Sequence, residues 1–146
     1  MAMMAAMFTS PSSARTRDVC PIDKGYAYNT SSNICAKMST YRTTWTNALY
    51  SCEVDGGYLG VMNSNEKKDM FFDLINGTDQ SVFVGSTNLY IDPYTWLDGS
   101  DIQFWKDGEP NNLSGEHCGG IRFVLWAMND IVCDHDQYFV CEIPMF

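Results

Sequence analysis

The segment EPNNLSGEHC, residues 109–118, concentrates oxygen donors in one short loop that ends on a cysteine. Carboxylate and amide oxygens without thiolate or imidazole suit a hard cation; Ca²⁺ takes about 6–8 of them, whereas Mg²⁺ prefers a tighter octahedron. The oxygen donors of this loop and of the following Asn-Asp pair nearly fill a calcium shell; they are Glu109, Asn111, Glu116, Asn129 and Asp130. The alternative is an ordinary polar surface loop, since such residues are common in turns.

The six cysteines constrain the compartment and the loop. Their even number, without a CxxC pair, predicts three disulfides in an oxidising environment, although spacing alone does not choose among the pairings. A bridge between Cys118 and Cys133 would bring residues 109–116 and Asn129-Asp130 to the same place. The cysteine at the end of the loop would then hold one group of calcium ligands against the other.

Length and charge exclude some functions. A chain of 146 residues predicts one compact domain, and its net charge of −9 disfavours nucleic-acid binding. No apolar run approaches the ~20 residues that a transmembrane helix needs. We interpret residues 1–17 as a disordered leader or an expression remnant and residues 18–146 as the domain. Sequons beginning at Asn29, Asn76 and Asn112 are compatible with a secreted protein.

Two helices are expected in the first half of the chain. Residues 44–52 place Trp45, Ala48, Leu49 and Cys52 on one face, with a threonine as N-cap and Gly56-Gly57 as the stop. The second helix follows residues 63–66, where Ser64 or Asn65 can cap it, and ends at Gly77. Its apolar side is expected to contain Met70, Phe71, Leu74 and Ile75.

The rest of the chain predicts strands around a long loop region. A hairpin is expected on either side of residues 29–33, with Cys20 and Cys35 placed to bridge it. Strands are expected at 82–84, 121–126 and 138–141, whereas residues 87–120 lack a regular pattern. A long irregular segment inside a compact domain is usually functional.

These residues occur in an order that resembles the C-type lectin-like domain from Cys20 to Glu142. The matching segments are Trp45-x-x-Ala48-x-x-x-Cys52, Gly56-Gly57-x-Leu59, Phe83-Val-Gly-Ser86, Trp96-Leu-Asp-Gly99, Trp105-x-x-Gly108-Glu-Pro-Asn111, Gly115-Glu-His-Cys118, Asn129-Asp-x-x-Cys133 and Tyr138-Phe-Val-Cys-Glu142.

The resemblance implies the long form of an α+β double-loop fold: two helices, small antiparallel sheets and a long calcium-binding loop region. It implies the disulfides Cys52–Cys141, Cys118–Cys133 and Cys20–Cys35, and a cis peptide before Pro110. By the same resemblance, the ligands of one principal calcium are Glu109, Asn111, Glu116, Asn129 and Asp130. We expect an auxiliary calcium site to be weak or missing, because acidic positions before Trp96 are occupied by Ser, Thr and Asn.

The resemblance also implies a function without catalysis. A Glu-Pro-Asn order is typical of lectins that bind equatorial 3- and 4-hydroxyls through calcium, as in mannose, glucose, N-acetylglucosamine and fucose. Leu113 is a candidate contact to the sugar ring, or a leucine that packs within the loop. Trp126 either covers the site or belongs to the core. We expect a secreted protein whose weak single sites need multivalency, for example a homo-oligomer.

Three alternatives remain open. His117-Cys118 and Cys133-Asp-His135 would suit zinc if both cysteines were reduced. Glu109 and Glu116 would suit a glycosidase pair only in a deep cleft with one raised pKa. A lectin-like domain that binds a protein or another non-sugar ligand is the third, and residues 90–94, YIDPY, are its candidate partner or dimer surface.

Overall fold

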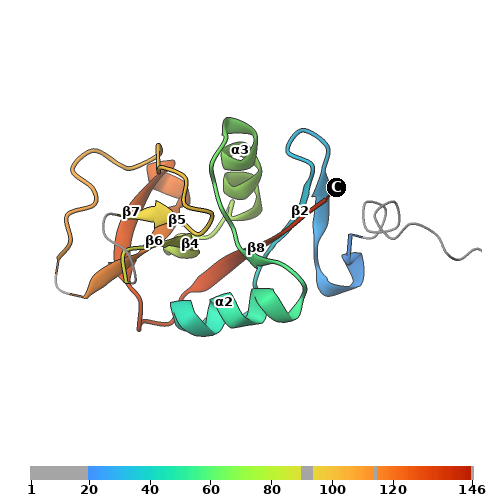
Figure 1. Cartoon of the computed structure of the whole chain (residues 1–146), viewed down its shortest axis with the longest axis horizontal. Coiled ribbons are helices and arrows are strands. Elements are labelled where there is room, and N and C mark those ends of the chain that lie inside the picture. The colour runs from blue at the N-terminus through green and yellow to red at the C-terminus, as the bar shows by residue number, and fades with distance from the viewer. Residues whose placement is uncertain (1–19, 90–93, 114, 146) are drawn as a thin grey trace, which may run out of the picture.

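The computed structural model describes residues 20–89, 94–113 and 115–145; residues 1–17, expected to be a leader, lie outside them. Strands on both sides of a central β8 carry one helix on each side (Figure 1). In chain order the described elements are η1 (Ile22–Lys24), β1 (Ala27–Asn29), β2 (Ile34–Met38), α2 (Trp45–Val54), β3 (Tyr58–Leu59), α3 (Asn65–Leu74), β4 (Val82–Thr87), β5 (Thr95–Trp96), β6 (Glu116–Arg122), η2 (Phe123–Leu125), β7 (Ala127–Val132) and β8 (Tyr138–Pro144).

Both helices begin at the residues that the sequence predicts. The Thr44 hydroxyl accepts the Asn47 N–H at 3.4 Å, and the Ser64 hydroxyl accepts the Lys67 N–H at 3.2 Å. Each cap satisfies a backbone donor that has no partner within the helix. After α2, Gly56 takes a φ of 93°, a conformation that glycine adopts without strain.

The sheet follows the order β1-β2-β8-β4-β6-β7, with β3 added on β8 and β5 on β4. Its pairs are antiparallel, as expected, except that β4 and β8 run parallel. Strands distant in the sequence can pair in this way because a long connection separates them. The α+β fold with two helices is confirmed.

Two apolar clusters cover opposite faces of the strands. Along β8, Val140 belongs to the cluster around α3, whereas Phe139 and Cys141 belong to the cluster around α2. The same alternation separates Val84 from Phe83 on β4. Successive strand residues point to opposite faces, so a strand that is covered on both sides has apolar residues at consecutive positions, as at 139–141 of β8 and 82–84 of β4.

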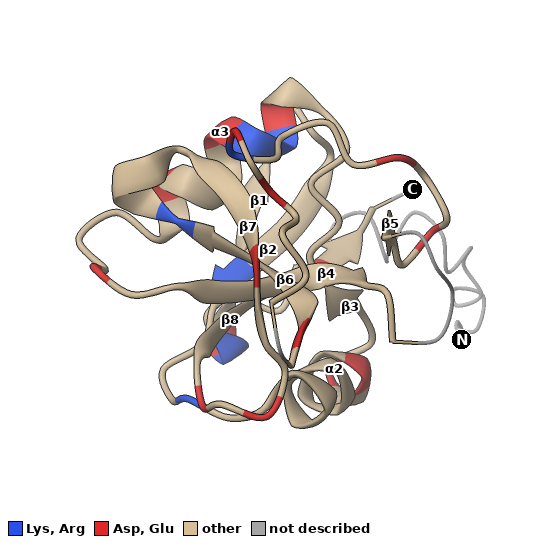
Figure 2. Cartoon of the chain, turned by 90° about the vertical axis from the view of Figure 1, so that its left-hand side faces the viewer, with Lys and Arg blue, Asp and Glu red and all other residues tan. Residues whose placement is uncertain are grey.

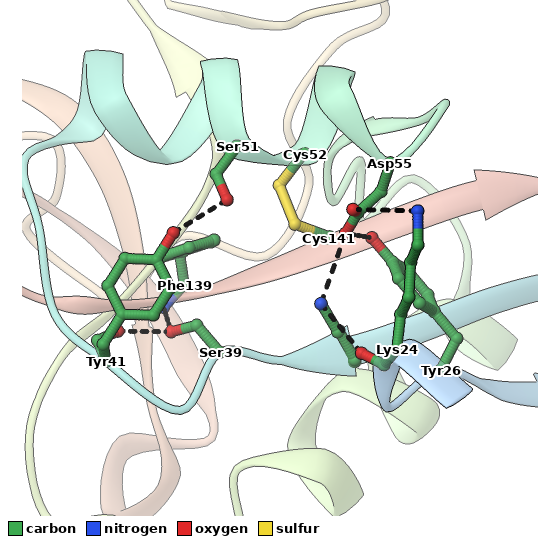
Figure 3. Close-up of a disulfide and its surroundings, with 10 residues drawn as sticks. Lys24, Tyr26, Ser39, Tyr41, Ser51, Cys52, Asp55, Phe139 and Cys141 are labelled. Atoms are coloured by element: carbon green, nitrogen blue, oxygen red, sulfur yellow. Dashed lines mark hydrogen bonds and ion pairs between the residues drawn. A yellow bond between two sulfur atoms is a disulfide. The ribbon is translucent and has the colours of Figure 1, made fainter. Parts of the chain in front are cut away.

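Three disulfides pair as the resemblance implies: Cys20–Cys35, Cys52–Cys141 and Cys118–Cys133. Figure 3 shows the Cys52–Cys141 bridge between α2 and β8. Beside it, Tyr26 donates a hydrogen bond to Asp55 at 2.8 Å, and Lys37 lies 3.2 Å from the same carboxylate. Burial alone would raise the pKa of Asp55, but these two contacts bring it below its usual value.

The strand predicted over residues 121–126 is wrong after Arg122. Strand β6 ends at Arg122, residues 123–125 form a 3-10 turn, and Trp126 takes a left-handed φ of 50° before β7 begins. The irregular stretch 87–120 also contains β5 and the start of β6. None of the helices that the structure describes is long and apolar enough to cross a membrane.

Candidate functional site

Strand β7 supplies two of the predicted ligands. Asn129 pairs with Gly120 of β6, and Asp130 pairs with Gly119. The Asp130 side chain is only 1% exposed, and both of its oxygens accept backbone N–H groups of the long loop: Asn111 at 3.4 Å and Asn112 at 2.7 Å. A buried carboxylate needs such partners. Asp130 therefore fixes the loop to the sheet.

The loop approaches β7 through backbone pairing. Met128 donates its N–H to Phe104 at 2.8 Å, and Lys106 donates to Met128 at 2.8 Å. Beyond this contact the Glu109–Pro110 bond is cis, as the resemblance implies. The loop thus comes back toward the strand just before Asn129.

Glu109 and Asn111 contact each other inside the loop. The Asn111 backbone N–H donates to Glu109 Oε1 at 3.1 Å, and its amide group donates to Oε2 at 3.5 Å. Asn111 Oδ1 accepts the Leu113 N–H at 3.3 Å. Leu113 itself is 60% exposed, so it does not pack inside the loop and is free to contact a ligand.

Glu116 starts β6, opposite Val132, on the other side of the loop. Its N–H donates to Leu113 at 2.9 Å, and its carbonyl accepts the Tyr94 hydroxyl at 3.3 Å. The Cys118–Cys133 disulfide joins β6 to the end of β7 close to this point. The bridge that the sequence suggests is therefore present, and it joins the strand that begins at Glu116 to the strand that carries Asn129 and Asp130.

The three carboxylates act on one another electrostatically. Burial, followed by a hydrogen bond with Asp130 and its negative charge, raises the pKa of Glu109. Burial and the charge of Asp130 also raise the pKa of Glu116. None of the three forms an ion pair with a lysine or arginine in the described part of the chain. A cation would remove this repulsion.

Asn129 adds an unsatisfied polar atom to this group of residues. Its side-chain oxygen is buried and has no hydrogen-bond partner. An unpaired buried oxygen costs free energy, which a metal ion or a donor would recover. As they stand, however, no three His, Cys, Asp or Glu side chains among residues 20–89, 94–113 and 115–145 are close enough together to hold a metal. Instead, the charge of Asp130 acts on Glu109 and on Glu116.

The zinc alternative is wrong, because Cys118 and Cys133 form a disulfide and offer no thiolate. His117 instead places Nδ1 3.1 Å from the Asn88 side-chain oxygen, and His135 is exposed.

Two positioning residues were not found from the sequence. Asn88 lies between His117 and Asn112, and its amide donates to Asn112 at 3.4 Å. Tyr94 is buried against Trp105, with ring centroids 5.0 Å apart. The proposed partner surface at residues 90–94 is therefore not free at Tyr94, while residues 90–93 lie outside the described residues. No motif marks either residue.

Comparisons with known proteins agree on one family. The model of the lectin C-type domain matches residues 41–143. Hepatic lectin of Gallus gallus is 30% identical over 117 residues, which are 76% of this chain and 55% of that protein. Human C-type lectin domain family 4 member C is 32% identical over 121 residues, or 75% of this chain and 54% of that protein. The chain thus spans about half the length of these relatives.

Solved structures share the fold. The carbohydrate-recognition domain of mouse scavenger receptor C-type lectin has a TM-score of 0.75 at 28% identity and covers 87% of this chain and 98% of its own. The cow CD23 domain, solved in the presence of a GlcNAc2Man3 oligosaccharide, has a TM-score of 0.75 at 25% identity, covering 88% and 98%. A calcium-independent type II antifreeze protein, at 23% identity and TM-score 0.74, covers 88% and 96% and shows the fold alone.

Proposed function

Because this chain belongs to the lectin C-type domain family, we propose that it binds carbohydrate through one principal calcium ion and catalyses no reaction. The matched model covers most of the described residues. The cow CD23 domain was solved in the presence of an oligosaccharide, and the domain of murine dendritic cell inhibitory receptor 2, 25% identical, in complex with an N-glycan. Both support a glycan as the class of ligand.

The proposed calcium ligands are Glu109, Asn111, Glu116, Asn129 and Asp130. The observation that carries this assignment is the environment of Asp130. Its buried carboxylate lies against a second one, on Glu109, which has a raised pKa, and next to an asparagine whose buried side-chain oxygen has no partner. Three carboxylate and two amide side chains form the all-oxygen set that calcium prefers. This donor set fits the ion.

A bound calcium would offer its remaining positions to two neighbouring hydroxyls of a sugar. The protein groups would then complete the hydrogen bonds of each hydroxyl. A carboxylate accepts the hydroxyl proton, and an asparagine amide donates to the hydroxyl oxygen. Glu109 and Asn111 would serve one hydroxyl, and Glu116 and Asn129 the other.

The order of these groups supports mannose-type specificity. Glu109 precedes Asn111 across a cis proline bond, so an acceptor and a donor stand in a fixed order. We propose that this order selects equatorial 3- and 4-hydroxyls, as in mannose, glucose, N-acetylglucosamine and fucose. The half-exposed Leu113 would contact the ring from the loop. Secretion and self-association for avidity belong to the same proposal.

A non-sugar ligand is the second candidate. Its support is the fold shared with a calcium-independent antifreeze protein, because one fold serves several functions. The candidates are distinguished by whether calcium controls sugar binding.

The test is retention on mannose-agarose in millimolar calcium, followed by elution with EDTA. The proposal expects retention that EDTA reverses and that free mannose competes, with a galactose resin as the matched control. Passage through the mannose resin, with calcium binding still detected by calorimetry, would keep the metal site and reject the sugar class. Absence of calcium binding would reject the site.

A further inference from the structure

A surface hollow lies outside the long loop, between α3 and the turn that joins β6 to β7. It encloses about 280 Å³ and is lined by Asp69, Phe72, Asp73, Asn76, Phe123 and Trp126. None of these residues belongs to the proposed calcium site. Three aromatic rings and two carboxylates therefore meet in a place that sugar binding does not use.

Trp126 forms the exposed wall of this hollow. Its side chain is 46% exposed, and its ring stacks on the buried Phe72 with centroids 4.5 Å apart. Phe123 meets it edge-on at 6.1 Å. Trp126 is therefore not a core residue. Its backbone lies in the left-handed region, with φ 50°, which a bulky residue rarely adopts. The turn therefore holds an aromatic face toward solvent in an unfavourable conformation.

The charges beside this ring are also unfavourable for the helix. Asp69 and Asp73 are four residues apart on α3, so two like charges face each other. Asp73 also lies in the last turn, where the negative end of the helix dipole disfavours an acid, and this turn has no basic residue. Neither carboxylate forms an ion pair within the described residues. Figure 2 shows acidic residues in red and basic residues in blue along α3.

A positive charge in the hollow would relieve both electrostatic costs: the repulsion between Asp69 and Asp73, and the unfavourable position of Asp73 at the end of the helix. The negative face of an aromatic ring attracts cations, and tryptophan does so most strongly. Alkylated ammonium groups combine a positive charge with an apolar surface, which matches carboxylates set beside aromatic rings. An exposed carboxylate stays hydrated, so it needs no N–H donor from the ligand.

We propose that this hollow binds an alkylated ammonium group of the choline type, independently of calcium. One cation of the chain already approaches Trp126, and it also lies over Phe104, a ring outside the hollow. Lys68 Nζ lies 4.9 Å from the Phe104 centroid and 5.8 Å from that of Trp126. Lys68 does not line the hollow. Its position shows that an ammonium group is accommodated beside the Trp126 ring, and the carboxylates of Asp69 and Asp73 line the hollow without it.

The experiment is a titration with choline chloride, followed by NMR of the tryptophan side-chain N–H signals, in EDTA and at constant ionic strength. Protein from a non-glycosylating host keeps Asn76, which begins a sequon, unmodified. The matched ligand control is 3,3-dimethylbutan-1-ol, a neutral compound with the shape of choline. Saturable binding of choline, with at least about fivefold weaker binding of the neutral compound, is expected from the charge attraction.

Two variants test the residues. Trp126→Ala should weaken choline binding by about tenfold or more. Asp69→Asn combined with Asp73→Asn keeps the shape of the hollow and should weaken binding by about fivefold or more. Asp101→Asn combined with Asp107→Asn removes the same number of exposed charges elsewhere and should change nothing. Retention on mannose-agarose should persist in all of these variants, which separates this site from the proposed lectin site.

Three outcomes would overturn the proposal. They are equal binding of choline and its neutral analogue, no saturable shift up to high millimolar choline, and the same loss of affinity in the control pair as in the Asp69 and Asp73 pair. Tighter binding of butylammonium than of choline would overturn the assignment to an alkylated cation.

Discussion

The carboxylate of Asp130 accepts the backbone N–H of Asn112 at 2.7 Å, which joins β7 to the long loop at the proposed calcium site. Burial, and after it the negative charge of Asp130, raises the pKa of Glu109 and of Glu116. A single buried residue therefore positions the loop and concentrates the negative charge that calcium would neutralise.

Replacing Asp130→Ala should abolish calcium binding and sugar retention while the domain still folds. The backbone donors that Asp130 satisfies belong to exposed residues, so water can replace the carboxylate, and the loss of stability should be about 1–3 kcal/mol. Calcium calorimetry, the mannose resin and thermal unfolding check the three parts. Asp101→Ala, at an exposed position of the same loop region, is the control. Sugar binding retained by Asp130→Ala would refute the assigned site.

The sugar preference should follow the order of acceptor and donor. Glu109→Gln with Asn111→Asp conserves the total charge but exchanges the two roles. Calcium binding should persist, and the variant should move from the mannose resin toward the galactose resin. If the variant binds calcium and still prefers mannose, contacts outside this pair select the sugar.

Acid should release calcium without unfolding the protein. The pKa values of Glu109 and Glu116 are raised in the metal-free protein, so protons compete with calcium at a higher pH than at an ordinary glutamate, about 4.3. Because the pKa of these two acids is raised in the folded state, the free energy of unfolding of the metal-free protein increases as the pH falls through that pKa. Calcium calorimetry and thermal unfolding at successive pH values should therefore diverge. Calcium affinity that stays constant down to pH ~4.3 would contradict the prediction.

Comparing two disulfides of equal sequence separation distinguishes a loss of stability from a loss of calcium binding. Cys20–Cys35 and Cys118–Cys133 each close a sequence separation of 15 residues, so loop entropy predicts a similar loss, about 3 kcal/mol, when either is removed. Only Cys118–Cys133 joins the strands that carry the proposed ligands. Paired Cys→Ala variants should thus unfold at similar denaturant concentrations, but only the second should bind calcium more weakly. Equal calcium affinities would show that the bridge does not organise the site.

Features that depend on neighbouring residues were predictable from the sequence, whereas features that depend on contacts between distant residues were not. Thr44 and Ser64 cap the helices because their hydroxyls act on neighbouring residues. The end of β6 was missed because residues 121–126 contain no glycine or proline to mark the turn at Trp126.

The same distinction applies to the candidate site. The loop residues are close in sequence, so their clustering could be predicted, and the order of motifs supplied the partners on β7. Asn88 lies 24 residues from the Asn112 that it contacts, and its position depends on the pairing of β4 with β6. The hollow beside Trp126 likewise depends on how α3 packs against a turn far along the chain.

A buried ion pair joins α3 to β8, and removing one of its partners should destabilise the fold more than replacing both. Lys67 Nζ lies 2.9 Å from Glu142, whose other carboxylate oxygen accepts the Val61 N–H at 2.5 Å. Burial raises the pKa of Glu142, and Lys67 opposes that rise. Lys67→Met would leave this carboxylate buried without its partner and should cost about 3–5 kcal/mol.

The double variant Lys67→Met with Glu142→Gln should recover most of that loss. Glutamine keeps an oxygen for the Val61 N–H but has no charge to compensate, so the helix can pack against the strand through apolar contacts. Denaturant unfolding of the wild type, both single variants and the double variant gives the coupling energy directly. If the loss of unfolding free energy in the double variant equals the sum of the two single losses, the two side chains stabilise the fold independently. The ion pair would then contribute no coupling energy.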